Sequence, residues 1–388
     1  MNKTLKMMME LIKCETLGVP LNDSYKIPLS DKEINALYEI SKAHDLCHVV
    51  GSAMIKYGLI EAESPIFEKF NNQILKAVSR YERINHELIS ICDALENAKI
   101  PFIPLKGSVL RAYYPEPWLR TSCDIDIYVQ AERLKDTIKT LENELGFKAE
   151  GAWINDVSLY SPSGVHLEIH YSDNDNKQTE VFVLKSVWEN SVPKDGKKYQ
   201  TLMSNEYFYL YHIAHMVKHF VSGGCGIRPF IDSVLIQERM PIDWDKFNNL
   251  LEKFGYNKFK EGCDKLIRVW FGDLEHDEDT LRMQHYLLKA GVYGDRENWI
   301  NMQKTKQGST KKHVLSRIFI SFEELRAKYP QLGNRRWLAP IYQVRRWFRV
   351  FRPSVYKRSM NEVKMTSSVS EETKREVMTM LNKLGLDE

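Results

Sequence analysis

The sequence predicts an α+β protein in which a short strand-containing unit lies between two helical regions. Apolar residues recur at three- and four-residue steps before about residue 98 and again after Thr201, as in amphipathic helices. Between these stretches, short apolar runs alternate with turn residues, as in strands and hairpins. We therefore expect an N-terminal helical region over 1–98, a central unit over 99–195 and a C-terminal helical region over 196–388.

The N-terminal region contains one especially clear helix, which is predicted to begin at Ser64-Pro65. Serine caps helix N-termini, and proline suits the first helical turn. An apolar stripe at helical spacing follows, which predicts a helix packed on a core. This stripe consists of Phe67, Phe70, Ile74, Val78, Tyr81, Leu88, Ile91 and Leu95.

In the central unit, the helical spacing of apolar residues ends at Ile100 and short apolar runs begin. The run IPFIPL predicts a short strand, KGS a turn, VLRAYY the start of a helix, and CDIDIYV a second strand. A helix is expected over 132–145, with Gly146 placed to end it. The runs VSLY and VHLEIHY, joined by SPSG, predict a hairpin.

The C-terminal region is predicted to be mostly helical, from EYFYLYHIAHMVKHF to the tail helix after Ser370. Its segment 304–358 holds 15 lysines and arginines against Glu323 and Glu324, a net charge of +13 in a chain whose total is +3. Aromatic residues such as Trp337 and Trp347 interleave with the arginines. This segment predicts an anionic partner, either RNA or a membrane surface, or else a helix whose aromatics are core.

Asp124 and Asp126 lie inside the otherwise apolar strand DIDIYV. Strand side chains alternate, so the two carboxylates project to one face, with Cα atoms about 6.5–7 Å apart. In HLEIH, Glu168 shares a face with His166 and His170. If the two strands are neighbours, Glu168 completes a cluster of three acids that a divalent cation would neutralise, as in phosphoryl-transfer enzymes. The alternative is strands with an ordinary solvated polar face.

The turn Lys106-Gly107-Ser108 precedes these acids and opens a helix. Gly107 lets the backbone approach a ligand, Ser108 offers a hydroxyl, and the first amides of the helix point at an anion. Lys106 and Arg120 are candidate partners of a phosphate or carboxylate. The turn is therefore predicted to bind an anion.

These motifs resemble the nucleotidyltransferase superfamily that includes DNA polymerase β. Its signature is a hydrophobic residue, Gly-Gly or Gly-Ser, a gap, and then Asp-hydrophobic-Asp/Glu-hydrophobic. The fuller pattern LKG…YP…R…DIDIYV…HLEIH…H…KH…G…IR…D is similar to a bacterial branch of that superfamily, over about residues 95–235. Here 15 residues separate Ser108 from Asp124, more than is usual, so the loop YPEPWLRTS is expected to be extended.

The resemblance implies a nucleotidyltransferase fold with a short mixed β-sheet. It also implies Mg²⁺-dependent (or Mn²⁺-dependent) transfer of a nucleoside monophosphate from an NTP to a hydroxyl acceptor, with release of pyrophosphate. By that pattern Gly107 and Ser108 hold the triphosphate. Asp124, Asp126 and Glu168 are the catalytic acids and the metal ligands.

Residues of the C-terminal region are expected to complete the nucleotide site. His215 and His219 lie on one helical face with His212, and they either pack against the catalytic unit or face the NTP or the acceptor. Arg228 and Asp232, four residues apart, either form an ion pair or act separately. In the second case Arg228 contacts phosphate and Asp232 is a base on the acceptor side.

The acceptor is left open between a small molecule or sugar, a tRNA end and a protein side chain. A non-catalytic nucleotide-binding or interaction protein on the same fold is the alternative function. A zinc hydrolase that uses His166, His170 and the histidines of 212–219 is a third.

The cysteine content and the hydropathy of the chain predict the cellular compartment of the protein. The six cysteines are scattered and form no CxxC pair, which favours a reduced, cytoplasmic protein. No run approaches the roughly 20 apolar residues of a membrane span, so we do not expect an integral membrane protein. The N-terminus lacks the pattern of a signal peptide.

Overall fold

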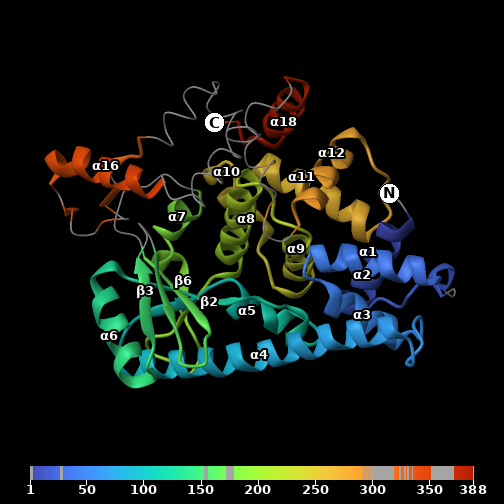
Figure 1. Cartoon of the computed structure of the whole chain (residues 1–388), viewed down its shortest axis with the longest axis horizontal. Helices are drawn as coiled ribbons and strands as arrows, with labels where there is room; N and C mark the ends of the chain where they lie inside the picture. Colours follow the sequence, from blue (N-terminus) through green and yellow to red (C-terminus); the bar gives the residue numbers. More distant parts are fainter. Residues whose placement is uncertain are drawn as a thin grey trace.

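The structure is a computed structural model, and it confirms a mixed α+β architecture with a five-stranded mixed sheet and many helices (Figure 1). It describes residues 3–26, 29–152, 156–171, 179–291, 294, 298, 319–322, 325–326, 329, 332–333, 335–350 and 371–387.

The main sheet has five strands in the order β1-β2-β5-β4-β3. Strands β2 and β5 run parallel and the other neighbouring pairs run antiparallel, so the sheet is mixed as expected. The predicted hairpin is the β4–β5 pair. The strands are β1 (Phe102–Pro104), β2 (Asp124–Val129), β3 (Lys148–Ala152), β4 (Asp156–Tyr160) and β5 (His166–His170).

The register between β2 and β5 decides where the acids lie. Asp126 pairs with Glu168, and Asp124 pairs with His166. Because paired residues of neighbouring strands project to the same face, the three acids share one face of the sheet. The expectation that the HLEIH strand neighbours the DIDIYV strand is therefore confirmed.

The opposite face of the sheet is covered by α4 (Pro65–Asn97) and α6 (Leu134–Leu145). Ile125 and Ile127, which alternate with the two aspartates, are fully buried in this layer. The amide of Phe67 donates to Oγ of Ser64, so α4 begins at the predicted cap. Gly146 ends α6 in the left-handed conformation, with φ +70°. The alternation of acids and isoleucines thus separates the site from the core.

The two helical regions meet in one core, although the sheet unit separates them in sequence. Buried residues of both regions form a single apolar cluster, and α1 contacts α11. Helix α4 runs beneath both the sheet and the N-terminal helices (Figure 1). The N-terminal helices are α1 (Lys3–Leu17), α2 (Asp31–Ala43) and α3 (Cys47–Lys56); the later ones are α7 (Thr179–Leu184), α8 (Asn205–Val221), α9 (Arg228–Arg239), α10 (Trp244–Phe254), α11 (Asn257–Phe271), α12 (Glu278–Ala290) and α18 (Glu371–Leu384).

A second, two-stranded sheet joins the central unit to the helices that follow. It pairs β6 (Ser191–Pro193) with β7 (Thr201–Met203), so the boundary expected at residue 195 lies in the turn between them. The carboxylate of Glu96, near the end of α4, accepts hydrogen bonds from the backbone amides of 198–200. This contact fixes the hairpin against the long helix.

Part of the basic-aromatic segment 304–358 lies outside the described residues, including 304–318 and 351–358. Its described part contains α16 (Ala339–Val350), which lies far from α1 (Figure 1). The guanidinium of Arg345 lies 5.7 Å from the ring centre of Tyr329, whereas Trp337 is 74% exposed. Some aromatics of this segment therefore pack and others face solvent. Within the described helices, none combines the length and the apolar composition needed to cross a membrane.

Candidate active site

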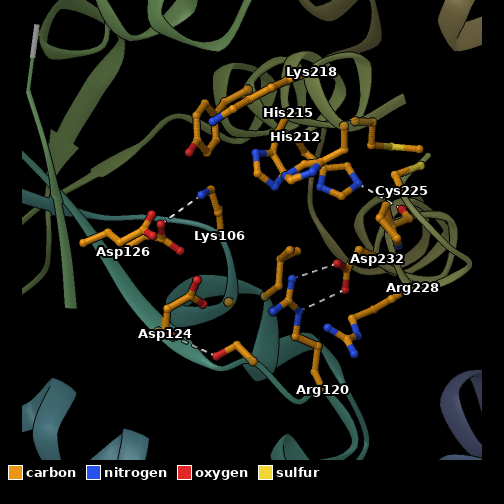
Figure 2. Close-up of a pocket in the computed structure, with 18 of the residues that line it drawn as sticks. Lys106, Arg120, Asp124, Asp126, His212, His215, Lys218, Cys225, Arg228 and Asp232 are labelled. Carbon is orange, nitrogen blue, oxygen red and sulfur yellow. Dashed lines mark hydrogen bonds and ion pairs between the residues drawn. The ribbon is translucent and has the colours of Figure 1, made fainter. Parts of the chain in front are cut away.

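A pocket of about 530 Å³ lies between the acid-bearing face of the sheet and helices α8 and α9. Figure 2 shows Asp124 and Asp126 on one side of this pocket and His215 and Lys218 on the other, with Lys106 between them. The predicted residues that line it are Lys106, Gly107, Arg120, Asp124, Asp126, Glu168, His215, His219, Arg228 and Asp232. Ten residues that the sequence predicts for the active site thus line a single pocket.

Asp126 is the most tightly held of the three acids. Its Oδ1 lies 2.9 Å from Nζ of Lys106 and 2.8 Å from Nε2 of His170. Burial alone would raise the pKa of Asp126, but Lys106 and then His170 hold it well below its usual range. Asp126 is therefore ionised at neutral pH.

Asp124 and Glu168 have a different electrostatic environment. Burial, and then the charge of Asp126, raise the pKa of both carboxyls above their ordinary values. Among the described residues, no side chain pairs with the Asp124 carboxylate. In the part of the chain that the structure describes, the ion-pair partners of Glu168 are histidines, with His170 at 3.6 Å and His166 at 3.9 Å. Across the described ranges, neither acid thus has an ammonium group within ion-pair distance, as Asp126 has.

The donor set fits a divalent metal ion. One group of potential ligand atoms belongs to Asp124, His166 and Glu168, and another to Asp126, Glu168 and His170. Within each group, all ligand atoms lie within 4.8 Å of one another. A cation there would neutralise the mutual repulsion of the carboxylates.

The Lys-Gly-Ser turn reaches the pocket through its first two residues. The backbone of Lys106 has φ +44°, which is unusual for a non-glycine residue, and its side chain then points at Asp126. A Cβ on Gly107 would lie 2.6 Å from Nη1 of Arg120, so any larger residue here would push against that guanidinium. Ser108 borders a separate hollow, and its amide donates to the carbonyl of Leu105. A contact of Ser108 with a ligand in the main pocket would require the turn to move.

Glu180, at the start of α7, is a buried carboxylate that the sequence analysis did not single out. It accepts hydrogen bonds from Nζ of Lys218 at 2.6 Å and from the hydroxyl of Tyr211 at 2.7 Å. Nδ1 of His215 lies 3.3 Å away and Nζ of Lys106 lies 3.8 Å away. Burial opposes ionisation, but Lys106 and His215 hold the pKa of Glu180 well below its usual range. Glu180 therefore anchors the cationic side of the pocket.

All three histidines of α8 line the pocket, and burial lowers the pKa of each. Burial lowers the pKa of His215 to about 3, with Lys106 acting in the same direction. Burial, with Lys218, lowers the pKa of His219 to about 4. Nε2 of His212 instead lies 3.0 Å from the carbonyl oxygen of Pro229, so it ties α8 to α9. In the described structure these histidines do not join His166 and His170 in a common metal-ligand group.

Arg228 and Asp232 lie on one helix but do not pair with each other. Asp232 accepts a hydrogen bond from Arg120 at 3.0 Å (Figure 2). It accepts another from the hydroxyl of Tyr114 at 2.7 Å. Arg228 pairs with Asp45 at 2.6 Å. Of the two alternatives for this pair, the i,i+4 ion pair is not formed, because each partner makes a tertiary contact to an element distant in sequence.

The comparison with protein families agrees with this geometry. A family model described as an uncharacterised nucleotidyltransferase matches residues 30–272. The chain belongs to this nucleotidyltransferase family. The curated proteins contain no match to it. The matched range runs from just before α2 to the end of α11, and it contains every residue of the pocket described above.

In this nucleotidyltransferase, the residues that escaped the sequence analysis include Asp45 and Lys218, which line the pocket, and Glu180, which pairs with Lys106 and Lys218. Lys218 is three residues after His215 and could have been found from the same helical face. Asp45 and Glu180 lie outside the motifs and reach the site only through folding. Both are acids that hold basic residues of the pocket, Arg228 and Lys218 respectively.

Proposed function

We propose that the protein transfers a nucleoside monophosphate from an NTP to a hydroxyl acceptor and releases pyrophosphate, using Mg²⁺ or Mn²⁺. The observation that carries this proposal is the register of β2 and β5, which brings Asp124, Asp126 and Glu168 onto one face of the sheet at the pocket. Family membership supports the general reaction class. The motif order further suggests a bacterial branch of the DNA polymerase β-like superfamily.

The three acids would hold the metal. A bound divalent ion would supply charge neutralisation for the triphosphate and would favour the ionised form of the acceptor hydroxyl. Asp126 enters this role already ionised. Asp124 and Glu168 each have a raised pKa, so they would bind the metal with release of any proton they carry.

The cationic side of the pocket would hold the triphosphate. Lys106 and Lys218 are suitable phosphate partners, and Glu180 fixes both ammonium groups toward the pocket. Gly107 lets the chain come close to a phosphate, as the glycine of such a turn would. Ser108 would join them only after a movement of the turn.

The remaining pocket residues would form the acceptor side. His215 and His219 are neutral and can each accept or donate a proton at one ring nitrogen. Asp232 is already saturated by Arg120 and Tyr114, so we assign it a role in positioning Arg120 rather than that of a base. Arg228, held by Asp45, would contact an anionic part of the acceptor or the NTP.

We also propose that the chain is divided into three regions, 1–98, 99–195 and 196–388, and that the protein is cytoplasmic. The cysteines are all free in the structure, which suits a reducing compartment. The acceptor is a small molecule or sugar, a tRNA or a protein. The basic segment 304–358 supports an anionic one.

The test is label transfer. The full chain is incubated with each α-³²P-labelled NTP, with Mg²⁺ or Mn²⁺, and with cell extract, and the label is followed into RNA, protein and small-molecule fractions. Asp124→Asn and Asp126→Asn should each abolish transfer. Asp136→Asn, an exposed aspartate on α6, is the matched control and should transfer normally.

The same experiment separates the alternative of a non-catalytic nucleotide-binding protein. Such a protein would bind an NTP, and its binding would weaken in the aspartate variants, but no fraction would acquire label. Transfer that survives in both aspartate variants would place the catalytic centre elsewhere.

A further inference from the structure

The two histidines that flank Glu168 add imidazole nitrogens to the proposed metal centre. We propose that His166 and His170 bind the metal directly, and that the centre therefore prefers Mn²⁺ or another borderline divalent ion over Mg²⁺. This inference rests on the proposed function, because it concerns the same site.

The first support is the placement of the histidines on β5. His166, Glu168 and His170 alternate along the strand, so all three project to the face that carries Asp124 and Asp126. Each of the two ligand groups contains one of these histidines, and Glu168 belongs to both. Glu168 would thus serve two adjacent metal positions, each completed by one aspartate and one histidine.

The second support is the contact of His170 with Asp126. Its Nε2 lies 2.8 Å from Oδ1 of Asp126 and 3.6 Å from Oε2 of Glu168. The side chain of His170 is 9% exposed, so it is packed in place beside these two carboxylates. A metal at this point would meet an imidazole nitrogen with little rearrangement.

His166 is held at the second position by its neighbours. Its ring stacks on Tyr160, with ring centres 4.7 Å apart. Its Nδ1 lies 3.9 Å from Oε1 of Glu168, and its register partner on β2 is Asp124. The stacked ring keeps the nitrogen on the side of the two acids.

The chemistry of these ligands sets the metal preference. Mg²⁺ is a hard ion that prefers oxygen ligands and keeps several of its waters. Imidazole suits later divalent ions, whose affinity for such a site rises along the series from Mn²⁺. A site of carboxylates alone would not discriminate in this way, so the two histidines are the specificity-determining residues.

The test measures metal binding by the chelator-treated full chain, independently of turnover. Mn²⁺ affinity is read from the electron paramagnetic resonance signal of free Mn²⁺, and Mg²⁺ affinity from competition. Pulsed measurements on the Mn²⁺ complex detect nitrogen that is bound directly to the metal. The variants are His170→Gln and His166→Gln, and the control is His86→Gln, an exposed histidine on α4.

The wild-type complex should show nitrogen coupling, and His170→Gln should reduce it. Each variant should weaken Mn²⁺ binding at least about tenfold, the loss seen even for residues that only orient a ligand, while Mg²⁺ binding changes much less. His86→Gln should match the wild type. A wild-type Mn²⁺ complex without nitrogen coupling, or an equal loss of both ions in the variants, would overturn the proposal.

The failures of the two proposals can be told apart. Transfer supported by Mg²⁺, with no nitrogen coupling to Mn²⁺, would overturn the metal assignment and leave the proposed function. Nitrogen coupling without transfer of label by either ion would overturn the proposed function and leave the metal assignment. The nitrogen signal of the wild type needs no variant, so a histidine variant that fails to fold does not block the test.

Discussion

Nζ of Lys106 lies 2.9 Å from Oδ1 of Asp126, on the sheet face that also carries Asp124 and Glu168. The ammonium therefore neutralises the carboxylate that the proposed metal also needs. The same Nζ lies 3.8 Å from the carboxylate of Glu180, at the start of α7. Lys106 thus contacts both an acid of the sheet face and Glu180. Replacing Lys106 should therefore affect both carboxylates, and this effect can be measured.

Replacing Lys106 should make the fold depend on metal. In Lys106→Gln, Asp126 and Glu180 lose a buried counter-ion, which should lower the free energy of unfolding by about 3 kcal/mol. Mn²⁺ should then raise the midpoint of thermal unfolding more in the variant than in the wild type, because the ion takes over the charge of the lysine. Equal shifts in both proteins would show that Lys106 and the metal do not share Asp126.

Glu180→Gln should destabilise the protein in a pH-dependent way. The pKa of Glu180 is lower in the folded chain than in the unfolded chain, so its contribution is complete above about pH 5 and is lost as the pH falls. The difference in unfolding free energy between wild type and variant should therefore be about 3 kcal/mol at pH 7 and should shrink below about pH 5. Denaturant unfolding at several pH values measures this. A constant difference would mean that the charge of Glu180 is unimportant.

The neutral variant Asp124→Asn should separate stability from activity. Because burial and Asp126 raise the pKa of Asp124, its ionised form at pH 7 disfavours the metal-free fold. The variant should therefore be as stable as the wild type or more stable, by up to about 1 kcal/mol, while label transfer falls at least about a thousandfold. A variant with lower stability in the absence of metal would contradict the charge argument.

Sequence reasoning found the sheet and its acids because both depend on local patterns. The alternation of Asp124, Ile125, Asp126 and Ile127 fixes which side chains face the core and which face the pocket. A single assumption, that β5 neighbours β2, then placed Glu168 beside the aspartates. The spacing of apolar residues and the order of the strands along the chain are therefore enough to predict the sheet and the place of its acids.

The remainder depends on contacts between distant segments, which periodicity does not encode. Glu180 is a single acid in a short helix, and only the packing of α7 on α8 brings it to Lys218. Arg228 is within reach of Asp232 on its own helix, but Asp45 competes successfully from a loop between α2 and α3. An ion pair between residues four apart on a helix stabilises it by only about 0.2–0.5 kcal/mol, so a tertiary partner easily replaces it.

Gly107→Ala tests the close approach between the Lys-Gly-Ser turn and Arg120. The backbone of Gly107 is helical, where alanine is favoured by up to about 1 kcal/mol, so any destabilisation must come from the new Cβ. That Cβ would lie 2.6 Å from Nη1 of Arg120, whose guanidinium is held by Asp232. We expect a loss of about 1–3 kcal/mol in unfolding free energy.

The control for this prediction is the same substitution in an Arg120→Ala background. With the guanidinium removed, the Cβ of alanine at 107 no longer clashes with residue 120. The substitution should then leave the free energy of unfolding unchanged or raise it. The double-mutant cycle isolates the contact, because the two residues touch and should therefore be non-additive. Additive effects would mean that Arg120 moves aside freely. Its ion pair with Asp232 would then not fix the guanidinium against the turn.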